Sequence, residues 1–229
     1  MKSRLNIENP FFEMMGRLGD IMIVNILFLV CSLPVVTAGT SVTAMYHAFQ
    51  EMADGRGTSA VKGFFGAWKK YRKQSLPVWL VMLAAGALLV FDLLFLGRAG
   101  QDGPWSMVSI GIGCLLLLWE MIFAYLFPTL PEMAEEGIRG KAVFQRSLYL
   151  AAGHFPVTVL MILLNIIPAA CMAASPFVMA LAVPVYMVVG FGLTGYLNTW
   201  LLRRCGVLPA RPLEMLPEDY GLEETEDEK

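Results

Sequence analysis

Two carboxylates stand inside long apolar runs of the sequence, where charged groups are rare. Glu120 directly follows the apolar residues 115–119, and Asp92 lies within the apolar run 88–96. An ionisable side chain at membrane depth is costly, so it marks an ion or proton pathway or a buried hydrogen bond. Glu120 is therefore expected either to serve a proton relay or cation contact, or to be a protonated or hydrogen-bonded residue that joins helices.

The two carboxylates are not expected to act as a catalytic pair. By the helical rise of about 1.5 Å per residue, Asp92 should lie nearer the external face than Glu120, with Arg98 as a candidate partner in the outer turn. The amides that could bond Glu120 from other apolar blocks are Asn25, Asn165 and Asn198.

Histidine and cysteine patterns indicate no metal site or nucleophile. His154 begins an apolar block beside Pro156, with His47 as the other histidine of the chain, and an interfacial hydrogen bond is its expected role. The sequence has no H-E-x-x-H, C-x-x-C, G-x-S-x-G or phosphate-loop spacing. We therefore expect no catalytic residue, no cofactor and no enzymatic activity.

Composition places these residues in a membrane protein. The 229 residues are 57% hydrophobic and 16% charged, with a mean hydropathy of +0.61, whereas soluble domains are about 25% charged. The apolar residues form long blocks without strand-like alternation, which predicts helices rather than a barrel. The predicted fold is an all-α, polytopic transmembrane helical bundle.

About six helices are expected, with five as the alternative. The clear spans are residues 21–36, 76–96, 105–127, 155–174 and 177–202. Residues 40–52 are ambiguous, because their apolar side chains follow helical spacing beside Thr43, His47 and Gln50. This segment either lies on the surface or makes a short second crossing that its neighbours shield from lipid.

Lysine and arginine counts favour six crossings. Of the 17 basic residues, Arg98 alone falls in the connections 97–104 and 175–176, which should then be external. The positive-inside rule places the basic connections, and both termini, on the cytoplasmic side of a bacterial cell membrane. Residues 1–204 are expected to form one membrane domain, and residues 205–229 an acidic, disordered cytoplasmic tail.

Amphipathic segments precede three of the spans. Two of these segments share an offset of 79 residues, which aligns Phe65 with Phe144 and Pro77 with Pro156. A third lies near residues 10–18. The pattern has two explanations. One is chance similarity of apolar sequences, and the other is three repeated units, each an interfacial elbow helix followed by a transmembrane hairpin. The elbow residues, expected to meet anionic lipid headgroups rather than nucleic acid, are Phe65, Trp68, Lys69, Lys70, Phe144 and His154.

A helix break is predicted near Pro34, because proline cannot donate the backbone hydrogen bond. Gly39 and several small hydroxyl residues follow it. The segment is either an irregular polar patch facing a small cavity, or a tight external turn in which small residues let two helices pack closely.

Several short strings resemble one family. They are NPFF at 9–12, RLGD at 17–20, LPVVTAGTSVTA at 33–44, YLFP at 125–128 and GHFP at 153–156. Together they resemble the YesL-like family of bacterial multipass membrane proteins, a domain of unknown function, over the chain up to about Arg204. The acidic segment 132–140 departs from that likeness. The resemblance implies genes often placed beside carbohydrate uptake systems of the ATP-binding cassette type, and it carries over no catalytic residue.

Three functional hypotheses follow, in order of preference. The first is a non-enzymatic accessory or assembly partner of a carbohydrate uptake permease complex. The second is a small solute transporter that acts as a homo-oligomer, with Glu120 and Asp92 lining the route. The third, a membrane-embedded enzyme, is weakest because no catalytic constellation can be named.

Overall fold

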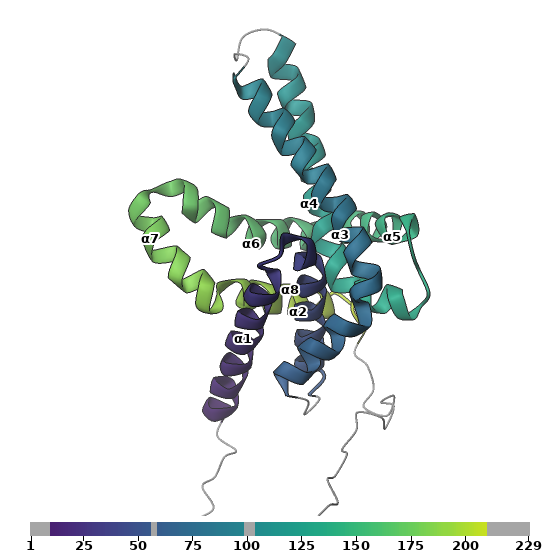
Figure 1. Ribbon diagram of the computed structural model, residues 1–229, viewed down its shortest axis with the longest axis vertical. Helices are drawn as coiled ribbons and strands as arrows, with labels where there is room; N and C mark the ends of the chain where they lie inside the picture. Colours follow the sequence, from purple (N-terminus) through teal and green to yellow (C-terminus); the bar gives the residue numbers. More distant parts are fainter. Residues whose placement is uncertain (1–9, 56–58, 99–103, 210–229) are drawn as a thin grey trace, which may run out of the picture.

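A computed structural model of the chain describes residues 10–55, 59–98 and 104–209, and these residues form helices and no strand (Figure 1). The predicted all-α polytopic bundle is thus confirmed. The elements are α1 (Pro10–Ser32), the 3-10 turn η1 (Val35–Thr37), α2 (Ala38–Ala53), α3 (Ala60–Arg98), α4 (Pro104–Glu135), α5 (Lys141–Gly153), α6 (Phe155–Ala174), α7 (Pro176–Val185), the π-helical turn η2 (Tyr186–Gly190) and α8 (Phe191–Arg204).

Four helical segments are long and apolar enough to cross a membrane: Met14–Ser32, Ala60–Phe95, Val108–Glu135 and Pro176–Arg204. The bent pair α5 and α6 raises this number to five when it is taken as one span. The 16 residues of α2 rise about 24 Å, which is less than the hydrocarbon core of about 30 Å. Six crossings therefore stay a prediction, which depends on α2.

Helix α2 is the centre of the molecule. Its residues from Gly39 to Gln50 are buried, apart from the half-buried Val42, and α1, α3, α4 and α8 all pack against it. The surface alternative for residues 40–52 is therefore wrong, because neighbouring helices shield this segment, and its crossing of the membrane stays a prediction. The helix tolerates burial of its hydroxyls because they bond backbone oxygens, as Thr43 Oγ1 does with Gly39 O at 2.9 Å.

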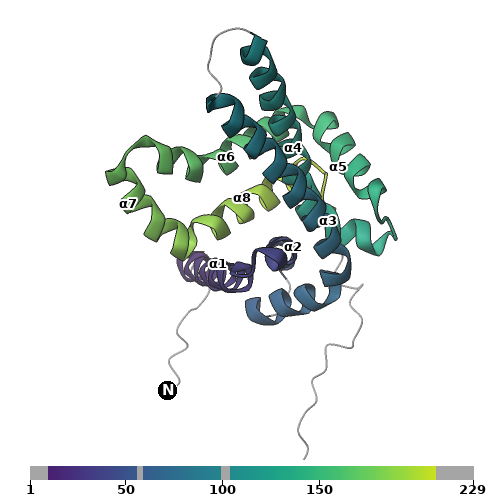
Figure 2. The same cartoon turned by 45° about the horizontal axis from the view of Figure 1, so that its top comes forward.

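The expected elbows form in two of three places. Helices α5 and α6 meet at 104° across His154, and the first turns of α3 run at a wide angle to its remainder although the helix is continuous (Figure 2). Helix α1 begins at Pro10 and continues without a break. A separate elbow over residues 10–18 was therefore a wrong prediction, since no proline or glycine pair interrupts the helix there strongly enough to end it.

Two arms leave the central body in different directions (Figures 1 and 2). One consists of the outer halves of α3 and α4, and the other consists of α6 and α7. The core lies where α1, α2, α8 and the inner halves of α3 and α4 meet, around Phe49, Phe64 and Phe127. The arms are therefore thin, two-helix structures with exposed apolar sides.

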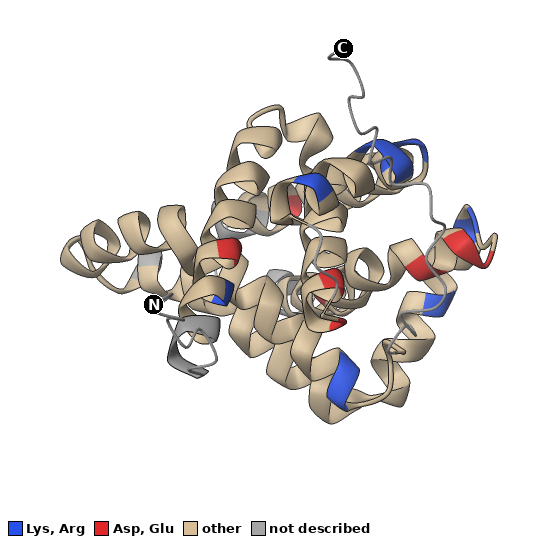
Figure 3. Cartoon of the chain, turned by 90° about the horizontal axis from the view of Figure 1, so that it is seen from below, with Lys and Arg blue, Asp and Glu red and all other residues tan. Residues whose placement is uncertain are grey.

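The ends of α2, α4 and α8 and the start of α3 gather at one end of the body. Arg203 of α8 pairs with Asp54 after α2 at 2.7 Å, and Lys70 of α3 pairs with Glu135 of α4 at 3.0 Å. Figure 3 views the molecule from this end, with the basic and acidic residues coloured. The connections that the basic-residue count placed on one side of the membrane thus lie together.

The folded chain continues a few residues beyond the expected domain boundary at 204. Leu208 is buried against a second cluster that includes Tyr125, Met161 and Leu202. Most of the expected acidic tail, residues 210–229, lies outside the described residues.

Candidate functional site

Glu120 is held in a chain of polar side chains that joins four helices. Its Oε1 accepts a hydrogen bond from Asn165 Nδ2 of α6 at 3.3 Å. Asn165 Oδ1 accepts from Asn198 Nδ2 of α8 at 3.1 Å, and Asn198 Nδ2 also reaches the Tyr46 hydroxyl of α2 at 3.3 Å. Two of the three expected amides therefore serve Glu120, one directly and one through its neighbour.

The glutamate lies in a cleft of about 370 Å³ between α1, α2, α4, α6 and α8. This volume is within the range of small-molecule sites. Among the residues that line the cleft, Glu120 is the one acidic side chain, and none is basic. The lining residues are Phe28, Val42, Met45, Tyr46, Trp119, Glu120, Phe123, Asn165, Pro168, Phe191, Thr194 and Gly195.

Two aromatic pairs form much of the wall. Trp119 and Phe123 of α4 stack at 5.4 Å between ring centroids, and Phe28 of α1 meets Phe191 of α8 at 6.0 Å. The indole is fixed by its Nε1, which donates to Met82 O at 2.9 Å. The rings of the wall are therefore held in defined orientations by contacts with one another and by this hydrogen bond.

The polar chain has acceptor capacity to spare. Asn198 is fully buried, and its Oδ1 has no hydrogen-bond partner among the described residues. Asn198 Nδ2 donates to Asn165 Oδ1, and Asn165 Nδ2 donates to Glu120 Oε1, so both amides turn an N–H group along the chain in the direction of the carboxylate. The arrangement suits binding of a cation or acceptance of a proton.

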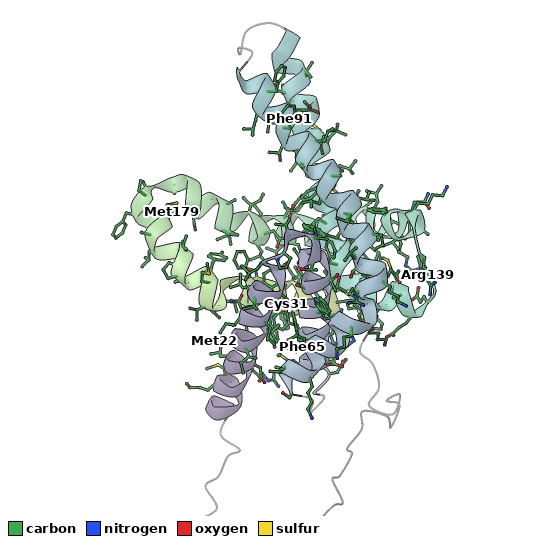
Figure 4. The ribbon with its side chains drawn as sticks, viewed as in Figure 1. Met22, Cys31, Phe65, Phe91, Arg139 and Met179 are labelled. Atoms are coloured by element: carbon green, nitrogen blue, oxygen red, sulfur yellow. The ribbon has the colours of Figure 1, made fainter. Side chains whose placement is uncertain are left out.

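Asp92 does not join this site. It is half-buried on the outer half of α3 and does not line the cleft. Its neighbour in sequence, Phe91, lies on the arm far from the body (Figure 4). The structure thus separates the two intramembrane carboxylates, and the expected common route does not run through a single cleft of the described chain.

Asn25 bonds a different partner. Its Oδ1 accepts from Gly192 N at 2.7 Å, and its Nδ2 donates to Met187 O at 2.8 Å. These contacts occupy backbone groups where η2 passes into α8, so Asn25 joins α1 to an irregular turn rather than to Glu120.

Pro34 and Gly39 form the tight turn that was one of two alternatives. Thr37 Oγ1 donates toward Cys31 O at 2.8 Å and Pro34 O at 2.9 Å, so the turn bonds its own backbone. A Cβ on Gly39 would clash with Cβ of Trp79, so glycine lets α2 and α3 approach closely.

The elbow residues have mainly positioning contacts. Lys70 and the Tyr71 hydroxyl both meet Glu135 Oε1, at 3.0 and 2.9 Å, which ties the start of α3 to the end of α4. Lys69 is exposed, and Phe65 is exposed at the base of the body (Figure 4). Trp68 and Phe144 are half-buried against the core.

The bend at His154 is closed by backbone contacts. Its Nδ1 lies 3.2 Å from Leu150 O, and Thr158 Oγ1 reaches across the bend to Ala151 O at 2.7 Å. His154 thus belongs to the helix junction. Within the described residues, no group of three His, Cys, Asp or Glu side chains could hold a metal ion.

Sequence reasoning missed the pair at the end of α2. Arg203 donates from Nη1 to Asp54 Oδ1 at 2.7 Å and from Nη2 to Gln50 O at 2.8 Å. The partners are about 150 positions apart in the chain, so no local spacing could have indicated them.

Comparison with known families identifies one part of the chain. Residues 21–93 match the model of a family described as a protein of unknown function, DUF624. This stretch is similar to the DUF624 family. YesL-like proteins carry DUF624, so the resemblance predicted from the sequence is confirmed. No curated protein and no solved structure matches the chain.

The DUF624 match covers the second half of α1, all of α2, and α3 up to Leu93. It contains the string at 33–44, the Pro34 turn and Tyr46. Glu120, Asn165 and Asn198 lie beyond the matched residues, so the cleft combines the matched segment with helices that follow it.

Proposed function

We propose that this integral membrane protein is a non-enzymatic accessory or assembly partner of a transport system in a bacterial cytoplasmic membrane. The partner proposed is a carbohydrate uptake permease complex of the ATP-binding cassette type. The N- and C-termini are proposed to be cytoplasmic. This role requires docking surfaces within the membrane and no catalytic groups.

The two arms carry the proposal. Leu88 and Phe91 on α3 are 62% and 66% exposed, and Phe177 and Leu181 on α7 are 80% and 67% exposed. Such faces must be covered by lipid or by the helices of another protein. A Cβ on Gly111 of α4 would meet nothing within 4 Å, so a further helix has room for close approach there.

The kind of partner is supported by the YesL-like resemblance, whose members are often encoded beside carbohydrate uptake systems. Two diverging arms suit a protein that contacts more than one subunit, since each arm offers an apolar surface in its own direction.

Site-specific photo-crosslinking in the native membrane tests this role. A photoreactive phenylalanine analogue is placed at Phe91 or Phe177 on the arms, and at Val30 on α1, which is 57% exposed, as the matched control. We expect adducts with a sugar-uptake permease from the arms and none from Val30. Adducts with lipid alone, or with a second copy alone, would refute the accessory role.

A small solute transporter is the second candidate, because the cleft places a carboxylate beside polar amides inside the bundle. In this alternative a homo-oligomer would be needed to bring Asp92 and Glu120 to one route. Glu120→Gln should then abolish complementation of a deletion strain. Full complementation by Glu120→Gln together with Asp92→Asn would exclude this candidate.

A further inference from the structure

The cleft around Glu120 has the chemistry of a site for a positively charged organic molecule. Glu120 Oε1 has one amide donor, Asn165 Nδ2, and the second carboxylate oxygen has no hydrogen bond from the described residues. No basic side chain lines the cleft. The carboxylate is thus oriented but not neutralised, and a cation in the cleft would supply the missing countercharge.

The rings around the carboxylate strengthen this preference. Trp119 and Phe123 lie on the same helix as Glu120, and Phe28 and Phe191 close the cleft from α1 and α8. The negative faces of aromatic rings attract ammonium groups, and a desolvated site makes this attraction larger.

A bare metal ion fits less well than an organic cation. Metal ions such as Na⁺ or Ca²⁺ need several oxygen ligands, and most of the lining side chains are aromatic or aliphatic. Asn165 Oδ1 is already occupied by Asn198, which leaves the carboxylate with few oxygen neighbours. An organic ammonium brings its own apolar substituents, which the rings can cover.

We infer that the cleft between α1, α4, α6 and α8 binds a small organic ammonium cation, with its charge against Glu120 and its alkyl groups between the aromatic pairs. Asn198 Oδ1, a buried acceptor without a partner among the described residues, lies one step along the same polar chain. Asn198 itself does not line the cleft, so the acceptor that would face a bound cation is the Glu120 carboxylate. This inference does not depend on the accessory role.

Calorimetric titration of the purified full chain tests the site. The probe is choline, and dimethylbutanol serves as its neutral carbon isostere, in micelles free of phospholipid. We expect one choline per chain and a dissociation constant at least about tenfold higher for the isostere, because only choline carries charge. Equal binding of both probes, or no binding of choline to the folded protein, would overturn the inference.

Two variants locate the site. Glu120→Gln keeps an oxygen for Asn165 but loses the charge, so choline affinity should fall about tenfold or more. Asp92→Asn removes the other intramembrane carboxylate, which does not line the cleft, and should change the affinity less than about twofold. Equal losses in both variants would refute a site at Glu120, and the wild-type comparison of the two probes stands even where a variant fails to fold.

A third titration separates the sources of the cation. Adding phosphatidylethanolamine to the micelles, with phosphatidylglycerol as the control lipid, shows whether a headgroup amine competes with choline. Competition by the first lipid alone identifies a lipid-derived ammonium, and no competition identifies a soluble one. Displacement of choline by millimolar Na⁺ or Ca²⁺ at constant ionic strength would instead indicate a metal site and overturn the inference.

Discussion

Gly39 sets the distance between α2 and α3, because a side chain there would enter the space of Trp79. A Cβ on residue 39 would clash with Trp79 Cβ, an atom that moves only with its backbone. Trp79 is held in turn by its Nε1, which donates to Val35 O at 2.7 Å. The Pro34 turn, Gly39 and Trp79 thus form one unit.

Gly39→Ala is expected to lower the free energy of unfolding by about 1–3 kcal/mol, because the added methyl overpacks the helix contact. Gly111→Ala is the matched control, since its Cβ meets nothing within 4 Å, and it should not destabilise the protein. Unfolding in detergent, followed by circular dichroism, measures both. Equal stability of the two variants would contradict the close approach.

Asn25 is expected to contribute strongly to the stability of the fold, because its side chain forms hydrogen bonds with two backbone groups of another segment. Asn25→Ala leaves Gly192 N–H without this acceptor, at an expected cost of about 1–3 kcal/mol. Ser147→Ala is the control, because the Ser147 hydroxyl bonds only a carbonyl of its own helix. The same unfolding assay should show a loss for Asn25→Ala of at least twice that of the control.

At the scale of elements, the most buried helix is anchored at its carboxyl end by the last helix. Arg203 bonds Asp54 Oδ1 and Gln50 O, and both charged side chains are largely buried, at 16% and 4% exposed. A cation at a helix C-terminus also meets the negative end of the helix dipole. Helix α8 therefore closes the bundle against α2.

Arg203→Gln should destabilise the protein by about 2–4 kcal/mol, because it removes the charged donor that bonds the buried Asp54 Oδ1 and Gln50 O. Adding Asp54→Asn should recover part of this loss, which a double-mutant cycle in the unfolding assay would show as coupling. Additive losses would mean that the two residues do not stabilise each other.

At the scale of the whole molecule, α7 at the tip of one arm and the start of α3 in the body are expected on opposite sides of the membrane. Single cysteines in a background without the four native cysteines should react with a membrane-impermeant maleimide on intact cells at Phe177→Cys and not at Lys62→Cys. Opening the cells should make Lys62→Cys reactive. Labelling of Lys62→Cys on intact cells would reverse the orientation, and labelling of both would exclude opposite sides for α7 and the start of α3.

Several features were predictable from local sequence. Long apolar blocks, and the absence of alternation in them, were sufficient for the all-α membrane fold, because a bilayer admits few other backbone arrangements. The DUF624 resemblance rested on contiguous strings such as residues 33–44, which need no tertiary information. Glu120 was identified because a carboxylate in an apolar run is conspicuous without its neighbours.

Other features depended on contacts between distant residues. The composition of residues 40–52 fitted both a surface helix and a buried one, and only packing by four other helices decided for burial. Likewise, three asparagines suited Glu120 equally, and the rotation of α1, α6 and α8 in the bundle gave it Asn165 and left Asn25 to η2.

The sequence by itself thus determined that the helices lie in a lipid bilayer and which side chains are energetically unfavourable there. Both depend only on side-chain type and on neighbours along the chain. The tertiary structure alone decided which polar groups meet and that Glu120 faces an aromatic cleft. These follow from helix rotation and crossing, which are set by packing between side chains far apart in sequence.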